Sequence, residues 1–210
     1  MRKLVAAIML LAATMIAAAQ NSPRNEAAVT VGHTFISDQT VPNTNFFDNT
    51  VHFGKGWSFG FNYARQLRDF NWGALAVEFP TIWNPDEDLN FGLNVAPRQY
   101  SSLFCTPAAR VTFLQNFVIS PWLSLGGGVG HFVASKDLLF GGPNPGHRIK
   151  TTGVMEGGVG FDVGLPGSFR EFKFRFEARD DWSGVPPINV DTGKTRQHNY
   201  YVAGGVVYRF

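Results

Sequence analysis

The sequence predicts an all-β protein, because large apolar side chains alternate with small or polar ones and no segment shows a comparable helical repeat. In residues 57–63 (Trp-Ser-Phe-Gly-Phe-Asn-Tyr) an aromatic residue occupies every second position, which is the period of a β-strand with two different faces. The 210 residues include 23 glycines and 20 phenylalanines. Because each glycine opposes helix formation by about 1 kcal/mol relative to alanine, this composition also favours strands.

The overall composition excludes several classes of protein. A formal net charge of +2 is too small to indicate a nucleic-acid partner, and a mean hydropathy of -0.06 excludes a bundle of membrane helices. Cys105 is the single cysteine, so a disulfide scaffold is excluded as well. Only 16% of the residues are charged, which is fewer than the usual quarter in a soluble domain.

The first nineteen residues have the pattern of a secretory signal peptide. Arg2 and Lys3 precede an apolar stretch at 4–16, and three alanines at 17–19 supply a small-residue cleavage site. A membrane anchor would need about 20 apolar residues, but polar residues begin at Gln20, and no cysteine follows that could carry a lipid. We therefore expect a signal peptide at 1–19 and one domain at 20–210. The leader holds two of the 18 basic residues and none of the 16 acidic ones, so this domain is formally neutral.

The spacing of the alternating segments predicts a transmembrane barrel. Eight strands are expected, at 27–36, 51–66, 72–83, 100–114, 121–135, 150–164, 172–183 and 198–210. The connections between them alternate between long ones, at 37–50, 84–99, 136–149 and 184–197, and short ones, at 67–71, 115–120 and 165–171. Short periplasmic turns and long extracellular loops are typical of membrane barrels. The predicted fold is thus an eight-stranded antiparallel up-and-down transmembrane β-barrel.

The two faces of the strands favour a membrane barrel over a soluble one. One face carries full-sized aromatic residues, and the other is rich in glycine and alanine, which a solvated surface does not require. The interior of an eight-stranded barrel is only wide enough to be filled by side chains, so small residues would leave room for a few long charged ones. Aromatic residues near strand ends are expected to form interfacial girdles; they are Trp57, Trp72, Trp83, Tyr100, Trp122, Tyr200 and Phe210.

The polar face also predicts a network of charged side chains inside the barrel. If the 165–171 turn joins its strands symmetrically, Asp162 faces Lys173 and Glu156 faces Arg179. Buried charges must be paired to be tolerated, so we interpret this set as a structural core of the lumen, with a charged constriction as the alternative. Its expected members are Glu78, Arg110, Glu156, Asp162, Lys173, Arg175, Glu177 and Arg179.

Two segments give the chain a family resemblance. Residues 206–210 (Val-Val-Tyr-Arg-Phe) resemble the last strand of bacterial outer-membrane proteins, and residues 121–130 (Pro-Trp-Leu-Ser-Leu-Gly-Gly-Gly-Val-Gly) resemble a glycine-rich strand of many such barrels. Residues 27–210 therefore look like a small barrel of the superfamily that includes the transmembrane domain of outer-membrane protein A. The resemblance implies that Tyr208 and Phe210 are recognised by the barrel assembly machinery. It does not imply an anchoring role, because no peptidoglycan-binding domain follows the barrel.

The sequence contains no complete catalytic or metal-binding pattern. Small outer-membrane barrels include lipid A-modifying enzymes with a His-x-Ser pattern, but none of the five histidines has a serine two residues later. The segment Asp86-Glu87-Asp88 begins like a calcium loop, yet Phe91 and Pro97 stand where glycine and glutamate are needed. We expect this segment to be an acidic, solvated part of the second long loop. No catalytic residue, metal ligand or cofactor is predicted.

The leading functional prediction is a non-enzymatic barrel whose exposed loops present a binding or protective surface. We expect the protein to reach the bacterial outer membrane after secretion and cleavage of the signal peptide. A narrow channel or small-molecule carrier is the alternative, and a lipid A-modifying enzyme is the third. The expected partners are outer-membrane lipid, lipopolysaccharide and the barrel assembly machinery. We expect a monomer that binds no nucleic acid.

Overall fold

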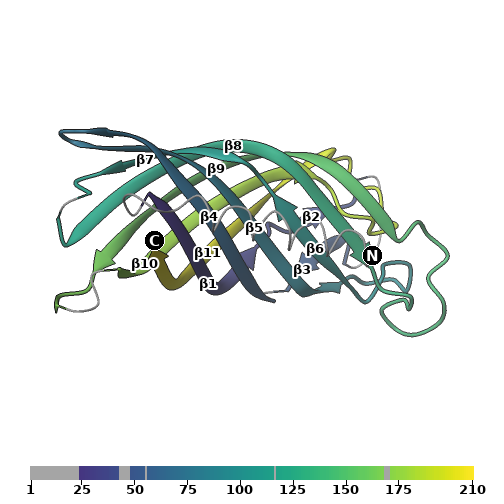
Figure 1. Ribbon diagram of the computed structural model, residues 1–210. Coiled ribbons are helices and arrows are strands. Elements are labelled where there is room, and N and C mark those ends of the chain that lie inside the picture. The colour runs from purple at the N-terminus through teal and green to yellow at the C-terminus, as the bar shows by residue number, and fades with distance from the viewer. Residues whose placement is uncertain (1–23, 43–47, 55, 116, 168–170) are drawn as a thin grey trace, which may run out of the picture.

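The computed structural model describes residues 24–42, 48–54, 56–115, 117–167 and 171–210, so the predicted signal peptide at 1–19 lies outside the described residues. The wall of a barrel is formed by eight strand segments (Figure 1). Seven of these are single strands, and β6 and β7 together form the eighth. The wall strands are β1 (Asn25–Phe35), β4 (Trp57–Phe70), β5 (Gly73–Asn90), β6 (Gln99–Cys105), β7 (Ala108–Phe113), β8 (Ile119–Ala134), β9 (Ile149–Gly164), β10 (Phe172–Gly184) and β11 (Arg196–Arg209).

The wall is a closed antiparallel ring. Each strand pairs with the next in the chain, and β1 pairs with β11 from Glu26↔Arg209 to Phe35↔Tyr200. Closure leaves no sheet edge in the wall, which is the condition for strands to cross a membrane. The prediction of an eight-stranded antiparallel up-and-down barrel is confirmed.

Connections of different length lie at the two ends of the barrel. The long ones, at 36–56, 91–98, 135–148 and 185–195, define what we call the long-loop end; Figure 1 shows the connection between β8 and β9 projecting there. The first of them contains two short strands, β2 (Gln39–Thr40) and β3 (Thr50–Phe53), which pair with each other. At the opposite, short-turn end, only two residues join β4 to β5.

Three of the eight predicted strands differ from the observed ones by more than two residues or are divided. The predicted strand 51–66 is two strands, because β3 ends at Phe53 and β4 begins at Trp57. The buried positions are odd-numbered in β3 (Val51 and Phe53) and even-numbered in β4, where Trp57 and Phe59 are exposed. The predicted strand 100–114 is divided into β6 and β7 at Pro107, which lacks a backbone N–H for the ladder. The third strand extends to Asn90 instead of ending at residue 83.

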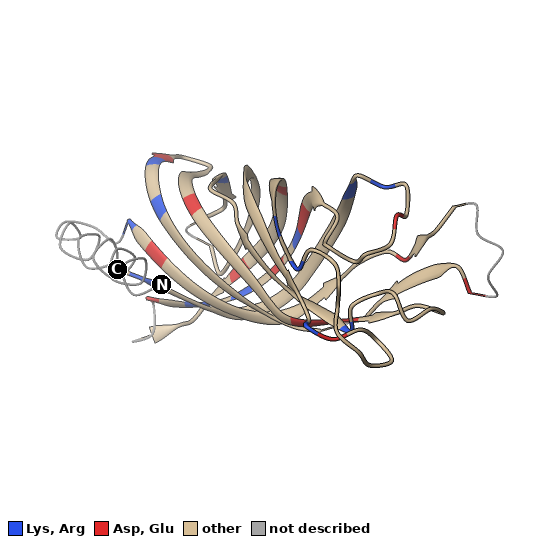
Figure 2. Ribbon diagram, turned by 90° about the vertical axis from the view of Figure 1, so that its right-hand side faces the viewer, with Lys and Arg blue, Asp and Glu red and all other residues tan. Residues whose placement is uncertain are grey.

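The outward face of the wall is apolar and the inward face is polar. On β10, Phe172, Phe174 and Phe176 are exposed, whereas Lys173 and Arg175 between them are buried. This is the reverse of a soluble barrel and suits a lipid surrounding. Figure 2, turned so that the right-hand side of Figure 1 faces the viewer, shows positions of both charge signs on the strands of the wall.

The aromatic girdle is smaller than predicted. Trp57, Trp72 and Trp83 are exposed near strand ends, as the girdle requires. Tyr100 and Trp122 were placed in the same girdle, but they are only 2% and 1% exposed and lie inside the barrel. The prediction was wrong for these two because nearness to a strand end does not specify which face a side chain occupies.

The long-loop end is filled by an apolar cluster that the wall and the connections build together. Wall residues such as Phe104 and Phe132 pack with Val51 and Phe53 of β3 and with Ile188 of the last connection. Burial of such side chains stabilises by about 1.5–3 kcal/mol each. We call this cluster and the connections that cover it the outer cap.

No helix in the described part of the chain is long and apolar enough to cross a membrane.

Candidate functional site

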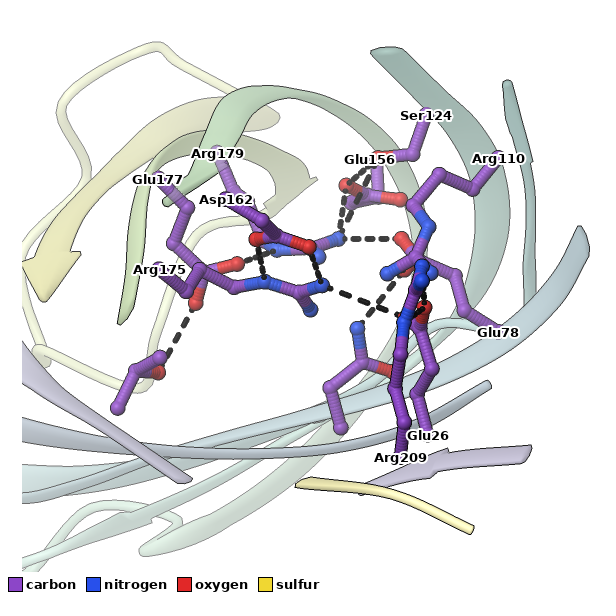
Figure 3. A network of polar contacts seen from close by, with 12 residues as sticks. Glu26, Glu78, Arg110, Ser124, Glu156, Asp162, Arg175, Glu177, Arg179 and Arg209 are labelled. Carbon is purple, nitrogen blue, oxygen red and sulfur yellow. Dashed lines mark hydrogen bonds and ion pairs between the residues drawn. The ribbon is translucent and has the colours of Figure 1, made fainter. Parts of the chain in front are cut away.

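The centre of the lumen is occupied by Arg179 of β10, whose guanidinium group contacts three carboxylates (Figure 3). Its Nη1 lies 2.9 Å from Glu78 Oε1 and 2.8 Å from Glu156 Oε1, and its Nε lies 3.0 Å from Glu177 Oε2. Strands β5 and β10 stand on opposite sides of the eight-strand ring, so the ion pair between Arg179 and Glu78 spans the lumen.

A second group of ion pairs lies nearer the short-turn end. Arg175 Nε and Nη2 donate to the two carboxylate oxygens of Asp162 at 2.8 and 2.9 Å, the bidentate geometry that is strongest for this pair. Glu26 of β1 accepts from Arg110 and, at 2.8 Å, from Arg209 Nε. Arg110 also reaches Glu78 at 3.3 Å, so the two groups form one continuous network.

The network is built around the indole ring of Trp122. The guanidinium carbons of Arg110, Arg175 and Arg179 lie 5.8, 5.2 and 5.0 Å from a ring centroid of this side chain, within the range of cation–π attraction. Gly160 on the neighbouring strand provides the space, since a Cβ there would be 2.5 Å from the indole. Together, Trp122 and the arginines fill the cross-section of the barrel at this level.

Replacing Gly160 by valine is therefore expected to destabilise the folded barrel. The added side chain would have to displace Trp122 or the wall, and overpacking of this kind costs about 1–3 kcal/mol. The matched control is Gly157→Val on the same strand, where a Cβ meets nothing within 4 Å. Unfolding by guanidinium in detergent micelles should show a lower midpoint for Gly160→Val than for Gly157→Val. Equal midpoints would contradict the packing of Trp122 against Gly160.

The structure corrects the predicted pairing between β9 and β10. Asp162 faces Arg175 instead of Lys173, and Glu156 faces Asp181 instead of Arg179. The partners are displaced by two residues because the connection between the strands is not centred where the prediction placed it. A shift of two keeps every side chain on its own face, so the inward set is unchanged. Glu156 still reaches Arg179, but diagonally rather than directly across the strands.

All eight predicted lumen residues are buried. Seven of them join the network, and the eighth, Lys173, lies near the short-turn end with Nζ 3.4 Å from Ser120 Oγ. Sequence reasoning missed Glu26 and Asp181, although both share strand parity with polar or small inward neighbours. Glu26 was missed because the first strand was predicted to begin at residue 27, whereas β1 begins at Asn25.

Carboxyl groups outnumber basic groups in the interior. Among the described residues, seven buried carboxyl groups accompany four buried basic groups, and Arg209 at the short-turn rim adds a fifth. Of these seven, Asp181 and Glu87 are the two for which no ion pair is found. Within the described residues, no hydrogen bond of good geometry reaches either Oε atom of Glu87 or Oδ1 of Asp181. The surplus of negative groups thus falls in the half of the barrel nearer the outer cap.

Glu87 was predicted to be solvated, but its side chain is buried. A β-bulge between Asn84 and Glu87 reverses the alternation of β5, which turns Glu87 inward and leaves Asp86 and Asp88 exposed. The outward residues of β5 change from apolar to acidic just beyond Trp83, so Glu87 lies outside the membrane-spanning part of the strand. Burial, reinforced by the charge of Asp88, raises the pKa of Glu87 to about 8 although the Gly56 backbone lowers it.

The connections of the outer cap are joined by hydrogen bonds. The Arg98 N–H donates to Asp137 O at 3.1 Å, and the Leu139 N–H donates to Ala96 O at 3.1 Å. These bonds tie the second long connection to the third. The outer cap therefore holds these connections in fixed positions relative to each other.

An asparagine links three of the connections. Asn189 Nδ2 donates to Val95 O at 3.2 Å and to Asn144 Oδ1 at 2.7 Å. The first and last connections also meet, where Thr192 Oγ1 donates to Gln39 Oε1 at 2.7 Å. All four long connections thus form one surface.

Four of the five histidines have side-chain or backbone partners other than serine. His52 Nδ1 lies 2.7 Å from Asp38 Oδ2, and His131 Nδ1 lies 2.9 Å from Thr151 Oγ1. In the part of the chain that the structure describes, we find no hydrogen bond between a histidine ring and a serine hydroxyl. The same residues contain no group of three or more His, Cys, Asp or Glu side chains placed to hold a metal ion.

Comparison with known proteins gives a match in structure but not in sequence. No protein-family model matches the chain, and no curated protein matches it in sequence. Neisserial surface protein A (NspA) superposes with a TM-score of 0.50 at 13% identity, covering 90% of this chain and 98% of that one. OprG, an outer-membrane protein of Pseudomonas aeruginosa, also has a TM-score of 0.50, at 11% identity, covering 89% of this chain and 96% of that one. The closed ring, the apolar outer face and these two matches show that the chain has the fold of the small outer-membrane β-barrel proteins.

Proposed function

We propose that the protein is a non-conducting, non-enzymatic barrel of the bacterial outer membrane whose outer cap is a binding surface. The observation that carries this proposal is the joining of all four long connections over the apolar cluster at the mouth of the barrel. Ordering loops in advance of binding lowers the entropic cost of recognising a partner.

The filled lumen supports this function over the alternative of a channel or carrier. The pair between Arg179 and Glu78 crosses the interior, and Trp122 lies against three guanidinium groups at the same level. An ion that passed through would have to separate buried charge pairs, which costs several kcal/mol for each one broken. The network is therefore interpreted as a structural core that holds the wall in shape.

The remaining expectations are part of the same proposal. Outer-membrane lipid and lipopolysaccharide would contact the apolar outer face, and the assembly machinery would recognise Tyr208 and Phe210, whose rings stack 5.6 Å apart. A monomer that binds no nucleic acid is the simplest form consistent with a closed wall and a small net charge. An enzymatic role has no support from the histidine contacts described above.

Planar-bilayer recording tests the proposal. The purified wild-type protein should give no reproducible current steps. Its recordings are compared with those of Arg179→Met, a variant that lacks the charge that spans the lumen. Regular steps in the wild-type protein whose size changes on Arg175→Ala would contradict the proposal and favour a channel. Silent wild-type bilayers, with retention of the compact fast-migrating form in unboiled detergent gels, would support it.

A further inference from the structure

A concave site lies on the outer cap between β3, the end of β5 and the third long connection. It has a volume of about 530 Å³, and its lining residues are His52, Phe53, Gly54, Asp88, Leu89, Asn90, Leu139 and Phe140. The pairing His52↔Asn90 and Phe53↔Leu89 fixes the β3–β5 side of this hollow. A pocket with an apolar lining and a few polar groups is the usual form of a recognition site.

The lining is apolar at its base and exposed at its aromatic edge. Phe53 and Leu89 are buried beneath the pocket, whereas Phe140 is 66% exposed. A partner that covers an exposed phenylalanine beside the pocket removes apolar surface from water, and this favours binding. The apolar part of the pocket therefore favours a ligand with a hydrocarbon stem or a flat face.

The charged groups that the structure describes beside the pocket are mainly carboxylates. Asp88 lines it and has an exposed carboxylate for which no partner is found among the described residues, and Asp38 and Asp48 lie on either side of the lining residue His52, with carboxylate oxygens 2.7 and 3.9 Å from its ring nitrogens. None of the eight lining residues is lysine or arginine. Asp86 adds another exposed carboxylate on the same strand extension. The local potential is thus negative, and the complementary ligand is a cation.

We propose that this pocket binds a lysine or arginine side chain of an extracellular peptide or protein. The cationic head would pair with Asp88 and the stem or guanidinium plane would lie against Phe140, where cation–π attraction adds to the ionic contact. The inference rests on the proposed function, because it identifies a partner chemistry for the outer cap. One such contact at an exposed site is weak, so the partner would present several cationic side chains.

The test uses a peptide of alternating glycine and arginine as the probe and the same peptide with citrulline, the neutral isostere of arginine, as its control. Binding to the full-length mature protein in detergent micelles is followed by fluorescence anisotropy of a label on the peptide. We expect Asp88→Asn and Phe140→Ala each to weaken binding of the arginine peptide about twofold to fivefold, the effect of losing one exposed ionic or cation–π contact. The matched controls are Asp191→Asn, on the last long connection, and Phe117→Ala, on a short turn at the opposite end, and both should leave it unchanged.

The outcomes separate this inference from the proposed function. Methyl resonances of Leu139 that shift with the arginine peptide and not with the citrulline peptide would place the ligand in the pocket. An equal loss of affinity in Asp88→Asn and Asp191→Asn would mean that charge alone attracts the peptide. Equal affinity for the arginine and citrulline peptides would mean that a cation is not recognised. Either result overturns the inference. Absence of peptide binding combined with silent bilayers would overturn it as well, yet leave the non-conducting surface role standing.

Discussion

Arg179→Met is expected to lower the free energy of unfolding by roughly 3–5 kcal/mol, the cost of leaving buried charges without their partner. Arg179 contacts Glu78, Glu156 and Glu177. Glu78 keeps Arg110 at 3.3 Å, whereas Glu156 would retain only the hydroxyl of Ser124 among its hydrogen-bond donors. Methionine preserves much of the volume and removes the charge, so the loss reports the ion pairs and not a cavity.

Equilibrium unfolding in detergent micelles measures this loss, with Arg65→Met as the control because Arg65 is an exposed arginine in the wall. The double variant Arg179→Met with Glu156→Gln should recover part of the stability, since it removes the carboxylate that the single variant leaves unpaired. A loss below about 1 kcal/mol in the single variant, or no recovery in the double one, would contradict the central role of Arg179.

Glu87→Gln is expected to stabilise the outer cap at alkaline pH and to have little effect in acid. The carboxyl group is buried and, among the described residues, has no ion-pair partner and no hydrogen bond of good geometry, and its pKa is raised by burial from 4.5 to about 8. Between these two values the folded protein keeps a proton that the unfolded chain has lost, so stability falls as the pH rises through this window and levels off above it. Glutamine has the same shape and no proton to lose.

The thermal midpoint of the wild type should therefore fall relative to that of Glu87→Gln between about pH 4.5 and pH 8. Asp137→Asn is the control, because Asp137 is exposed on the same outer cap. Its midpoint should follow the wild type at every pH. Parallel curves for the wild type and Glu87→Gln would show that Glu87 titrates alike in both states, contrary to the buried position described here.

The fold could be predicted from the sequence because it depends on period and parity. Alternation in segments such as 172–183 reveals which residues share a face, and this information survives an error of two residues in register. For this reason Arg175 and Arg179 were assigned correctly to the inward face although their cross-strand partners were not. Partners depend on how many residues the turn at 165–171 uses, which alternation does not encode.

Other errors have a common cause in local breaks of the alternation. The bulge before Glu87 exchanges the inward and outward positions along β5. The inward and outward positions are also exchanged between the end of β3 at Phe53 and the start of β4 at Trp57. Each reversal moved a residue from the expected environment to the opposite one, and Glu87 became a buried acid in place of a solvated one. The outer cap could not be predicted because its core unites segments far apart in the chain, such as Val51 and Ile188.

Every proposal above requires that the apolar face of the wall points to lipid and the charged face to the lumen. The five tryptophans test it directly, because Trp57, Trp72, Trp83 and Trp182 are 60%, 54%, 50% and 38% exposed on the outside, while Trp122 is 1% exposed within the charge network. Five variants that each retain one tryptophan, with phenylalanine at the other four positions, can be placed in vesicles whose acyl chains are brominated near the headgroup. Bromine should quench the fluorescence of the four outward tryptophans and leave Trp122 unquenched. Strong quenching of Trp122 together with unquenched outward tryptophans would contradict the assignment of the two faces.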